Sequence, residues 1–224
     1  MRYRSVSSQA RLAHGFDAGE VWAVSGYRPN SAKGAGESGP SLRERILDTA
    51  SALFYREGVH AVGVDLVVKE SGIAKTSLYR HFGSKDALVA AFLEREDEDF
   101  WSQWGTIADR HQDNPKAELQ AYLEWMTERL KRPGYRGCPQ LNVAAELPNP
   151  NHPARKVAQL HKEKMRRHLA ALAERMGLRR PDEVGAQLAL AFDGAFISAP
   201  FGEGDRLAAT LRDSVKLVVK AARP

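Results

Sequence analysis

The chain has 224 residues and a formal net charge of +5, from 33 Lys and Arg against 28 Asp and Glu. With 43% hydrophobic and 27% charged residues, it is neither fibrous nor disordered throughout, and its length allows one large domain or two modest ones. The single cysteine, Cys138, excludes an internal disulfide and a zinc site built from several cysteines. No apolar run reaches the roughly 18 residues of a membrane span, and residues 1–10 lack the hydrophobic segment of a signal peptide, so we expect a cytoplasmic protein.

The first forty residues differ from the rest of the chain. They contain six Gly and six Ser and have no sustained hydrophobic period. Such a segment buries too little apolar surface to offset the entropy lost on ordering. We therefore predict a disordered extension over residues 1–40. Residues 34–39 formally match the dinucleotide-binding pattern G-x-G-x-x-G, but no strand precedes them and no βαβ unit follows, so the pattern does not indicate an enzyme.

From Ser41 onward the pattern predicts an all-α fold. Ser41 and Glu44 have the spacing of a capping box, and apolar residues then recur at helical spacing until Gly58. No later stretch alternates apolar and polar residues convincingly enough for a strand. We expect helices over residues 42–57, 64–71, 75–82, 85–111, 114–131, 139–147, 153–176, 182–199 and 204–222.

Residues 64–82 predict a helix-turn-helix unit. Val67 lies on the inner face of a first short helix, Gly72 supplies the turn, and Leu78 and Phe82 lie on the inner face of a second. Two short helices joined around a glycine form this unit, and its second helix enters the major groove of DNA. The alternative is a pair of helices that only packs into a core.

The outward side of the second helix has the chemistry for DNA contacts. Residues 75–85 hold three cations, one histidine and no acid, whereas residues 41–100 hold eight Lys and Arg against eleven acids, so the basic signal is local. The first turn faces base edges, and later residues face phosphates, where backbone amides at a helix start also bind anions. The candidate DNA-binding residues are Lys75, Thr76, Ser77, Tyr79, Arg80, His81 and Lys85.

Residues 43–88 resemble the DNA-binding domain of the TetR family of transcriptional repressors. The resemblance rests on ILDTASALFYREG at 46–58, the turn at Gly72, LYRHF at 78–82 and SKDAL at 84–88. It implies a DNA-binding domain over 41–100, followed by a helical ligand-binding and dimerisation domain over 101–224. It also implies a repressor that binds a palindromic operator in double-stranded DNA and responds to a small-molecule effector. Where the family usually has a hydroxyl residue before the first motif helix, this chain has Gly63.

The C-terminal part holds a group of aromatic residues that either packs a core or lines an effector pocket. Cofactors, metals and catalytic residues are not expected. Within the region that the resemblance assigns to the effector, the candidate pocket residues are Trp101, Trp104, Tyr122, Trp125, Asn142, Glu146 and Phe192.

Two apolar stripes near the C-terminus are candidates for a homodimer interface through helices 182–199 and 204–222. A dimer would set two recognition helices about 34–36 Å apart, as a palindrome requires. The alternative is that each stripe faces the chain's own core. The stripes are Val184, Leu188, Ala191, Phe192 and Ala195 on the first helix, and Leu207, Ala208, Leu211, Val215 and Val218 on the second.

Three further features have alternative interpretations. Cys138 is either an oxidant-sensing thiol or an inert buried one. The acidic run at 94–99 and the pair His161 and His168 are interpreted as solvated helix faces, because their spacing does not suit a metal site. A helical protein that binds something other than DNA is the remaining alternative, and loss of DNA binding in a folded Tyr79→Ala variant would exclude it.

Overall fold

The computed structural model describes residues 40–224, and within this range it contains helices and no strand, which confirms the all-α prediction. The predicted extension lies outside the described residues, apart from Pro40. The helices are α2 (Leu42–Glu57), α3 (Val64–Ser71), α4 (Lys75–Phe82), α5 (Lys85–Arg110), α6 (Pro115–Leu130), α7 (Pro139–Glu146), α8 (Pro153–Arg175), α9 (Pro181–Ser198), the short 3-10 helix η3 (Ala199–Phe201) and α10 (Gly204–Ala221).

Polar side chains cap the starts of α2 and α5, and the cap of α2 is the one that the sequence predicts. The Ser41 hydroxyl accepts a hydrogen bond from the Glu44 amide, and the Glu44 carboxylate accepts one from the Ser41 amide at 2.7 Å, which completes the capping box of α2. The Ser84 hydroxyl accepts from the amide of Ala87 at the start of α5. These bonds satisfy amides that have no partner within their own helix.

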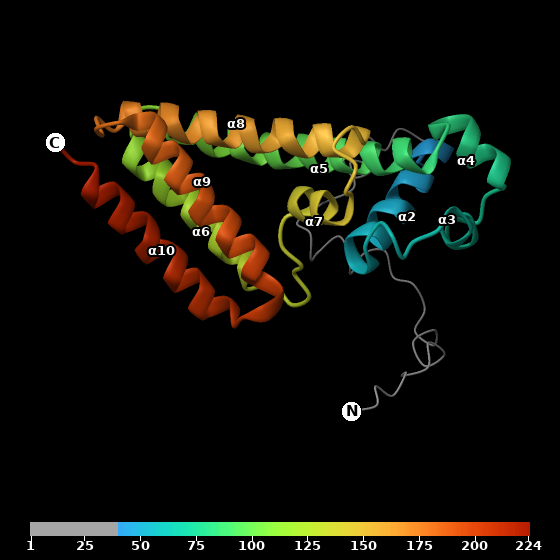
Figure 1. Ribbon diagram of the computed structural model, residues 1–224. Helices are drawn as coiled ribbons and strands as arrows, with labels where there is room; N and C mark the ends of the chain where they lie inside the picture. The colour runs from blue at the N-terminus through green and yellow to red at the C-terminus, as the bar shows by residue number, and fades with distance from the viewer. Residues whose placement is uncertain (1–39) are drawn as a thin grey trace.

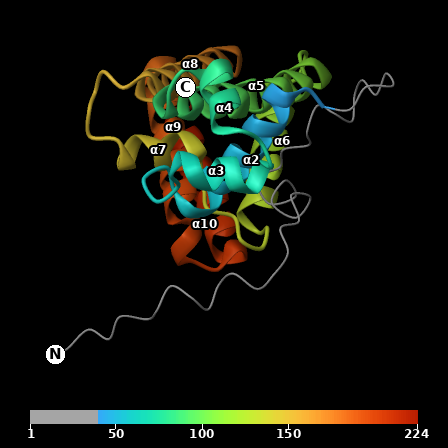
Figure 2. The same cartoon turned by 90° about the vertical axis from the view of Figure 1, so that its right-hand side faces the viewer.

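The long helices α5 and α8 run side by side along the molecule (Figure 1). Helices α2, α3 and α4 lie at one end, whereas α6, α9 and α10 lie at the other, with α7 between the two groups (Figure 1). Figure 2 shows α3 and α4 together on the side that faces the viewer. With 26 residues, α5 extends about 39 Å and belongs to both ends of the molecule. The predicted domain boundary at residue 100 falls within this helix and stays a prediction.

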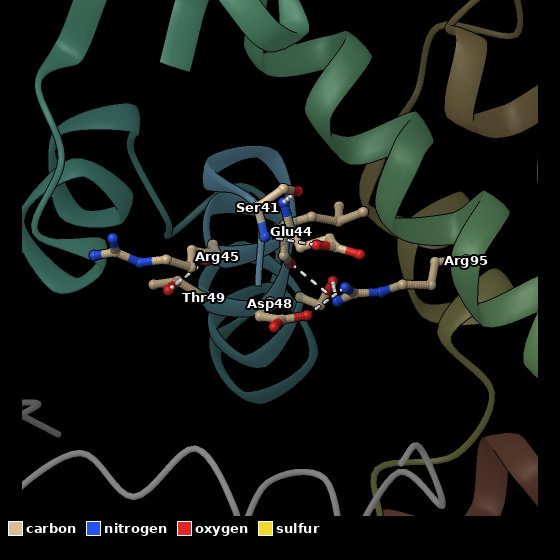
Figure 3. A network of polar contacts seen from close by, with 8 residues as sticks. Ser41, Glu44, Arg45, Asp48, Thr49 and Arg95 are labelled. Carbon is tan, nitrogen blue, oxygen red and sulfur yellow. Dashed lines mark hydrogen bonds and ion pairs between the residues drawn. The ribbon is translucent and has the colours of Figure 1, made fainter. Parts of the chain in front are cut away.

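Arg95, on α5, attaches α2 to this long helix (Figure 3). Its guanidinium donates to the Asp48 carboxylate at 2.6 Å and to the backbone carbonyl of Leu47 at 3.0 Å, and it also donates to the Ser51 hydroxyl. The Arg95 side chain is largely buried. Several charge-assisted hydrogen bonds to one buried cation fix both position and direction. Helix α2 is therefore held in a fixed position relative to α5.

The core at the C-terminal end corrects the predicted dimer stripes. Val184, Leu188 and Phe192 are buried within the same chain, as are Leu211 and Val215 on α10. These side chains cannot form a surface in a second copy's interface. A different side of α9 and α10 remains exposed, and it carries Leu190, Ile197, Phe201 and Leu217.

Among the described residues, the segment Pro181–Phe201 is long and apolar enough to cross a membrane by length and composition alone. Its mean hydropathy is 1.3. A core helix has the same composition, and here α9 packs one side against α8 and α10. The composition is therefore weak evidence for a membrane span.

Close packing of α8 and α9 requires glycine at position 185. A Cβ atom there would lie 2.6 Å from the backbone nitrogen of Ala170. We expect Gly185→Ala to lower the free energy of unfolding by about 1–3 kcal/mol, because the two backbones would have to separate. Gly105→Ala is the control, since a Cβ at position 105 meets no atom within 4 Å. It should stabilise α5 by up to about 1 kcal/mol. Urea denaturation measures the free energy of unfolding of both variants. An equal change in the two would show that close packing does not require glycine at position 185.

Candidate nucleic-acid interface

The turn between α3 and α4 sets the direction of α4. Gly72 has φ 66° and ψ 34°, a left-handed conformation that favours glycine. The amide of Ile73 donates back to the carbonyl of Val68. Arg45 on α2 donates to the carbonyl of Ser71 at 3.1 Å, so the end of α3 is also held by the preceding helix. The chain thus leaves α3 in one defined direction.

Helix α4 has a buried apolar side and an exposed polar side. Leu78 and Phe82 are buried, as predicted, and the guanidinium of Arg43 stacks over the Phe82 ring at 5.0 Å. Tyr79 is 43% exposed although it is a large aromatic residue. An exposed aromatic ring between cations suits contact with a nucleic acid.

The structure places the seven candidate DNA-binding residues along α4 and at the first position of α5. Their exposure differs, so they are not equivalent. Exposed are Lys75, Thr76, Tyr79 and Arg80, and half-buried are Ser77, His81 and Lys85.

Sequence reasoning missed an ion pair that involves one of these residues. The Lys75 ammonium lies 2.7 Å from the carboxylate of Asp65, which is in the first turn of α3. The hydrogen bond from Lys75 and the charge of Asp65 raise the pKa of Lys75 above its ordinary value. Lys75 therefore has an intramolecular partner that a DNA phosphate or base would have to replace. The spacing of ten residues across a turn gives no sequence signal for such a pair.

Four of the five aromatic candidates for the effector site, Trp101, Trp104, Tyr122 and Trp125, belong to one group of contacting rings, and the fifth, Phe192, is fully buried. The rings of Trp104 and Tyr122 lie 3.8 Å apart, and Phe100, which sequence reasoning missed, contacts Trp101, Trp104 and Trp125. Tyr122 is fully buried, and its hydroxyl donates to the Glu118 carboxylate at 3.1 Å. Much of this group is therefore packed interior.

Asn142 and Glu146 lie elsewhere. They line a recess between α2 and α7 whose lining includes none of the five predicted aromatic residues. The Glu146 carboxylate accepts from the amide of His60 at 2.9 Å, and its backbone carbonyl lies 2.6 Å from the His60 ring. The two α7 residues thus face the DNA-binding end. The pocket formed by all seven residues stays a prediction.

The side chains predicted to form solvated helix faces are only partly exposed, because His161 is buried and Glu96, Asp97 and Asp99 are half-buried. Only Glu94 and Glu98 of the acidic run are exposed, and burial raises the pKa of Glu96 to about 7 and that of Asp99 to about 6. His161 is buried, whereas His168 is exposed. Buried polar atoms without a hydrogen-bond partner are Asp99 Oδ2, Arg129 Nε, Arg132 Nη1, Gln140 Oε1 and His161 Nε2.

Within residues 40–224, no three His, Cys, Asp or Glu side chains come together as a metal site would require.

Known proteins are similar to this chain in sequence and in the arrangement of the helices. The model of the family described as bacterial regulatory proteins, tetR family, matches residues 46–92. An HTH-type transcriptional regulator of Staphylococcus aureus (strain USA300) is 31% identical over 86 residues, which are 38% of this chain and 46% of that relative. The match thus spans about half of the relative's length.

Two solved structures extend the likeness to the C-terminal helices. A TetR-type transcriptional regulator from Streptomyces avermitilis has a TM-score of 0.71 and 33% identity, over 82% of this chain and 98% of that one. SCO4454, a TetR-family transcriptional regulator from Streptomyces coelicolor, has a TM-score of 0.78 and 28% identity, over 82% and 96%. The fold and the exposed side of α4 define a helix-turn-helix, DNA-binding transcriptional regulator and not an enzyme. The chain belongs to the TetR family.

The ion pair of Asp65 and Lys75 predicts a gain of DNA affinity on its removal. We expect Asp65→Asn to strengthen binding to every DNA sequence, by about a few-fold at most, since an exposed ion pair is weak and its removal leaves Lys75 available to the DNA. Glu70→Gln on the same helix is the charge-matched control, and it should have a smaller effect because Glu70 does not hold Lys75. Fluorescence anisotropy with labelled DNA measures both. The gain in DNA affinity should disappear when Asp65→Asn is combined with Lys75→Gln. If the gain persisted in the double variant, it would not come from the release of Lys75.

Proposed function

We propose that the protein is a homodimeric repressor, located in the cytoplasm, that binds a palindromic operator and is released by a small-molecule effector. DNA binding is supported by the two sides of α4. One side is apolar and buried, and the other is exposed and has two cations and Tyr79. Helix-turn-helix proteins place this side of the second helix in the major groove.

Within α4 we assign two kinds of contact. Lys75, Thr76 and Ser77, in the first turn, contact base edges or adjoining phosphates. Tyr79, His81 and Lys85 bind mainly phosphates, and Arg80 does either. Phosphate contacts supply affinity and register, whereas contacts with base edges supply sequence preference.

For the dimer, the supporting observation is an exposed apolar stripe on the outer side of α9. Leu190, Gly194 and Ile197 follow each other at intervals of four and three residues, which is one face of α9, and Phe201 follows in η3. Phe201 is 88% exposed, and Leu217 adds an exposed apolar side chain on α10. Apolar side chains gathered in this way mark an interaction surface. At Gly194 a Cβ would meet no atom, so the surface is open there.

Binding of a small-molecule effector is supported by the interior of the C-terminal end. Two residues with an unpartnered buried atom, His161 and Arg129, contact rings of the aromatic group, and such atoms are rare in a core because each costs free energy. A bound molecule that supplies hydrogen bonds would satisfy them. It would change the DNA-binding end only if it binds the two states of the protein with different affinity.

Selection of genomic fragments by the purified protein tests the DNA-binding part. We expect an enriched palindrome, and we expect Tyr79→Ala to abolish the enrichment without unfolding. Lys85→Ala should weaken all sequences alike and reduce the salt slope by about one unit. Lys116→Ala is a matched control, because Lys116 is an exposed cation on α6.

A change of base preference in Lys85→Ala would contradict its role as a phosphate contact. Absence of any enrichment from folded protein, including protein refolded after unfolding to remove a bound ligand, would contradict the proposed function.

Analytical ultracentrifugation tests the dimer surface. We expect Ile197→Asp to shift the protein to a monomer and to weaken binding to the palindrome, because an apolar interface would have to bury a charge. Leu160→Asp on α8 is the control: Leu160 is 51% exposed and Ile197 47%, but Leu160 lies outside the stripe. An equal effect of both substitutions would place the interface elsewhere.

A further inference from the structure

Residues 135–137 lie between the end of α2 and the end of α9. The hydroxyl of Tyr55, on α2, donates to the carbonyl of Gly137 at 3.2 Å and accepts from the amide of Arg136 at 2.9 Å. Tyr55 is only 6% exposed. A buried hydroxyl that uses both its donor and its acceptor has one favourable orientation, because the loss of either hydrogen bond would leave a buried polar atom unpaired.

The Arg136 side chain makes two further contacts with the same end of α2. Its Nη1 atom donates to the backbone carbonyl of Tyr55 at 3.0 Å and also to that of Arg56. Both carbonyls belong to the last turn of α2, where no amide of the helix itself can satisfy them. A cation at this end is also favoured by the helix dipole. Residues 135–137 are thus bound to α2 by side chain and main chain together.

On its other side the same segment contacts the backbone of α9. Gly137 has φ 84°, and a Cβ atom at this position would collide with the carbonyl oxygen of Phe196. Only glycine permits both the left-handed conformation and the close approach. The Tyr135 ring packs edge-on against the Phe196 ring, with 6.5 Å between the centroids. The residue after Phe196 is Ile197, which belongs to the exposed apolar stripe proposed as the dimer surface.

These contacts hold α2 at a different point from Arg95. Arg95 contacts Asp48 and Ser51 near the middle of α2, whereas residues 135–137 contact its last turn. One point of attachment leaves a helix free to pivot, and a second point removes that freedom. Because α2 packs against α3 and α4, the two attachments together set the direction of α4 relative to α9.

We propose that Tyr55, Arg136 and Gly137 determine which spacing of operator half-sites the protein accepts. This inference rests on the proposed dimer, in which α9 of each copy lies at the shared surface. One additional base pair between the half-sites moves them about 3.4 Å apart and turns them by about 35°. A dimer with two fixed recognition helices accepts one such spacing, whereas a dimer whose DNA-binding ends pivot accepts several. Tyr55 and Arg136 are positioning residues, since they act through α2.

The full-length protein tests this inference on palindromes that share one half-site and differ only in the spacer. The half-site comes from the genomic fragments that the protein selects, and the spacer is lengthened or shortened by single base pairs. We expect the unchanged protein to prefer one spacing by about tenfold or more. Tyr55→Phe removes only the hydroxyl, and it should reduce that preference by about fivefold, the equilibrium factor for one hydrogen bond. Arg136→Gln should reduce the preference as well.

The ratio of affinities between spacings is the deciding quantity, because a loss of stability alone would weaken binding at every spacing alike. Ile107→Val is the matched control, since it removes one carbon atom from a buried side chain of α5 and none of the hydrogen bonds to α2. It should leave the ratio unchanged. Affinity for a single half-site should also stay the same in Tyr55→Phe, because the side chains of α4 are unaltered.

An unchanged ratio in both Tyr55→Phe and Arg136→Gln would overturn the inference, and so would an equal change in Ile107→Val. If Tyr55→Phe does not fold, Arg136→Gln decides, because Arg136 is exposed. The proposed function is judged on the unchanged protein alone. If that protein binds no DNA, or prefers no spacing, the proposed dimer on a palindrome is wrong and this inference with it. A preference that the variants keep would overturn this inference only.

Discussion

The attachment of α2 to α5 through Arg95 is the constraint on which the other parts of the molecule depend. One guanidinium joins an acidic side chain, a backbone carbonyl and a hydroxyl of α2, and it does so from the middle of the longest helix. A largely buried cation with these partners has one favourable position, because any other would lose the charge of Asp48 or a hydrogen bond. The helix-turn-helix unit is therefore oriented by the same helix that packs against α8 in the C-terminal core.

A second connection acts on the opposite end of α2. Arg136 and α7 reach the last turn of α2 and the residues after it from the C-terminal half of the chain. Helix α2 is thus held at two separate places by elements that also border the buried polar groups. This arrangement offers a physical route from the interior to α4, since α2 packs against both α3 and α4. A route of packed contacts is a necessary condition for coupling, and a measured change in affinity is what demonstrates it.

The buried polar groups explain why the C-terminal interior is more than a packed core. Asp97 on α5 pairs with His161 on α8, and Lys162 on α8 pairs with Asp193 on α9. Satisfied pairs of this kind specify one arrangement of the helices.

The sequence by itself determined the helices, their caps, the turn at Gly72 and the outward side of α4, because each depends on residues within a few positions of one another. Only the tertiary structure decided which side of a long helix is buried. Helix α9 is apolar on nearly every side, so periodicity cannot distinguish Leu188 and Phe192, which are inside, from Leu190 and Ile197, which are outside. His161 is buried and part of the acidic run on α5 is half-buried because partners arrive from α6 and α8, and the Asp65–Lys75 pair forms across a turn. Contacts between residues far apart in the chain leave no periodic pattern in it.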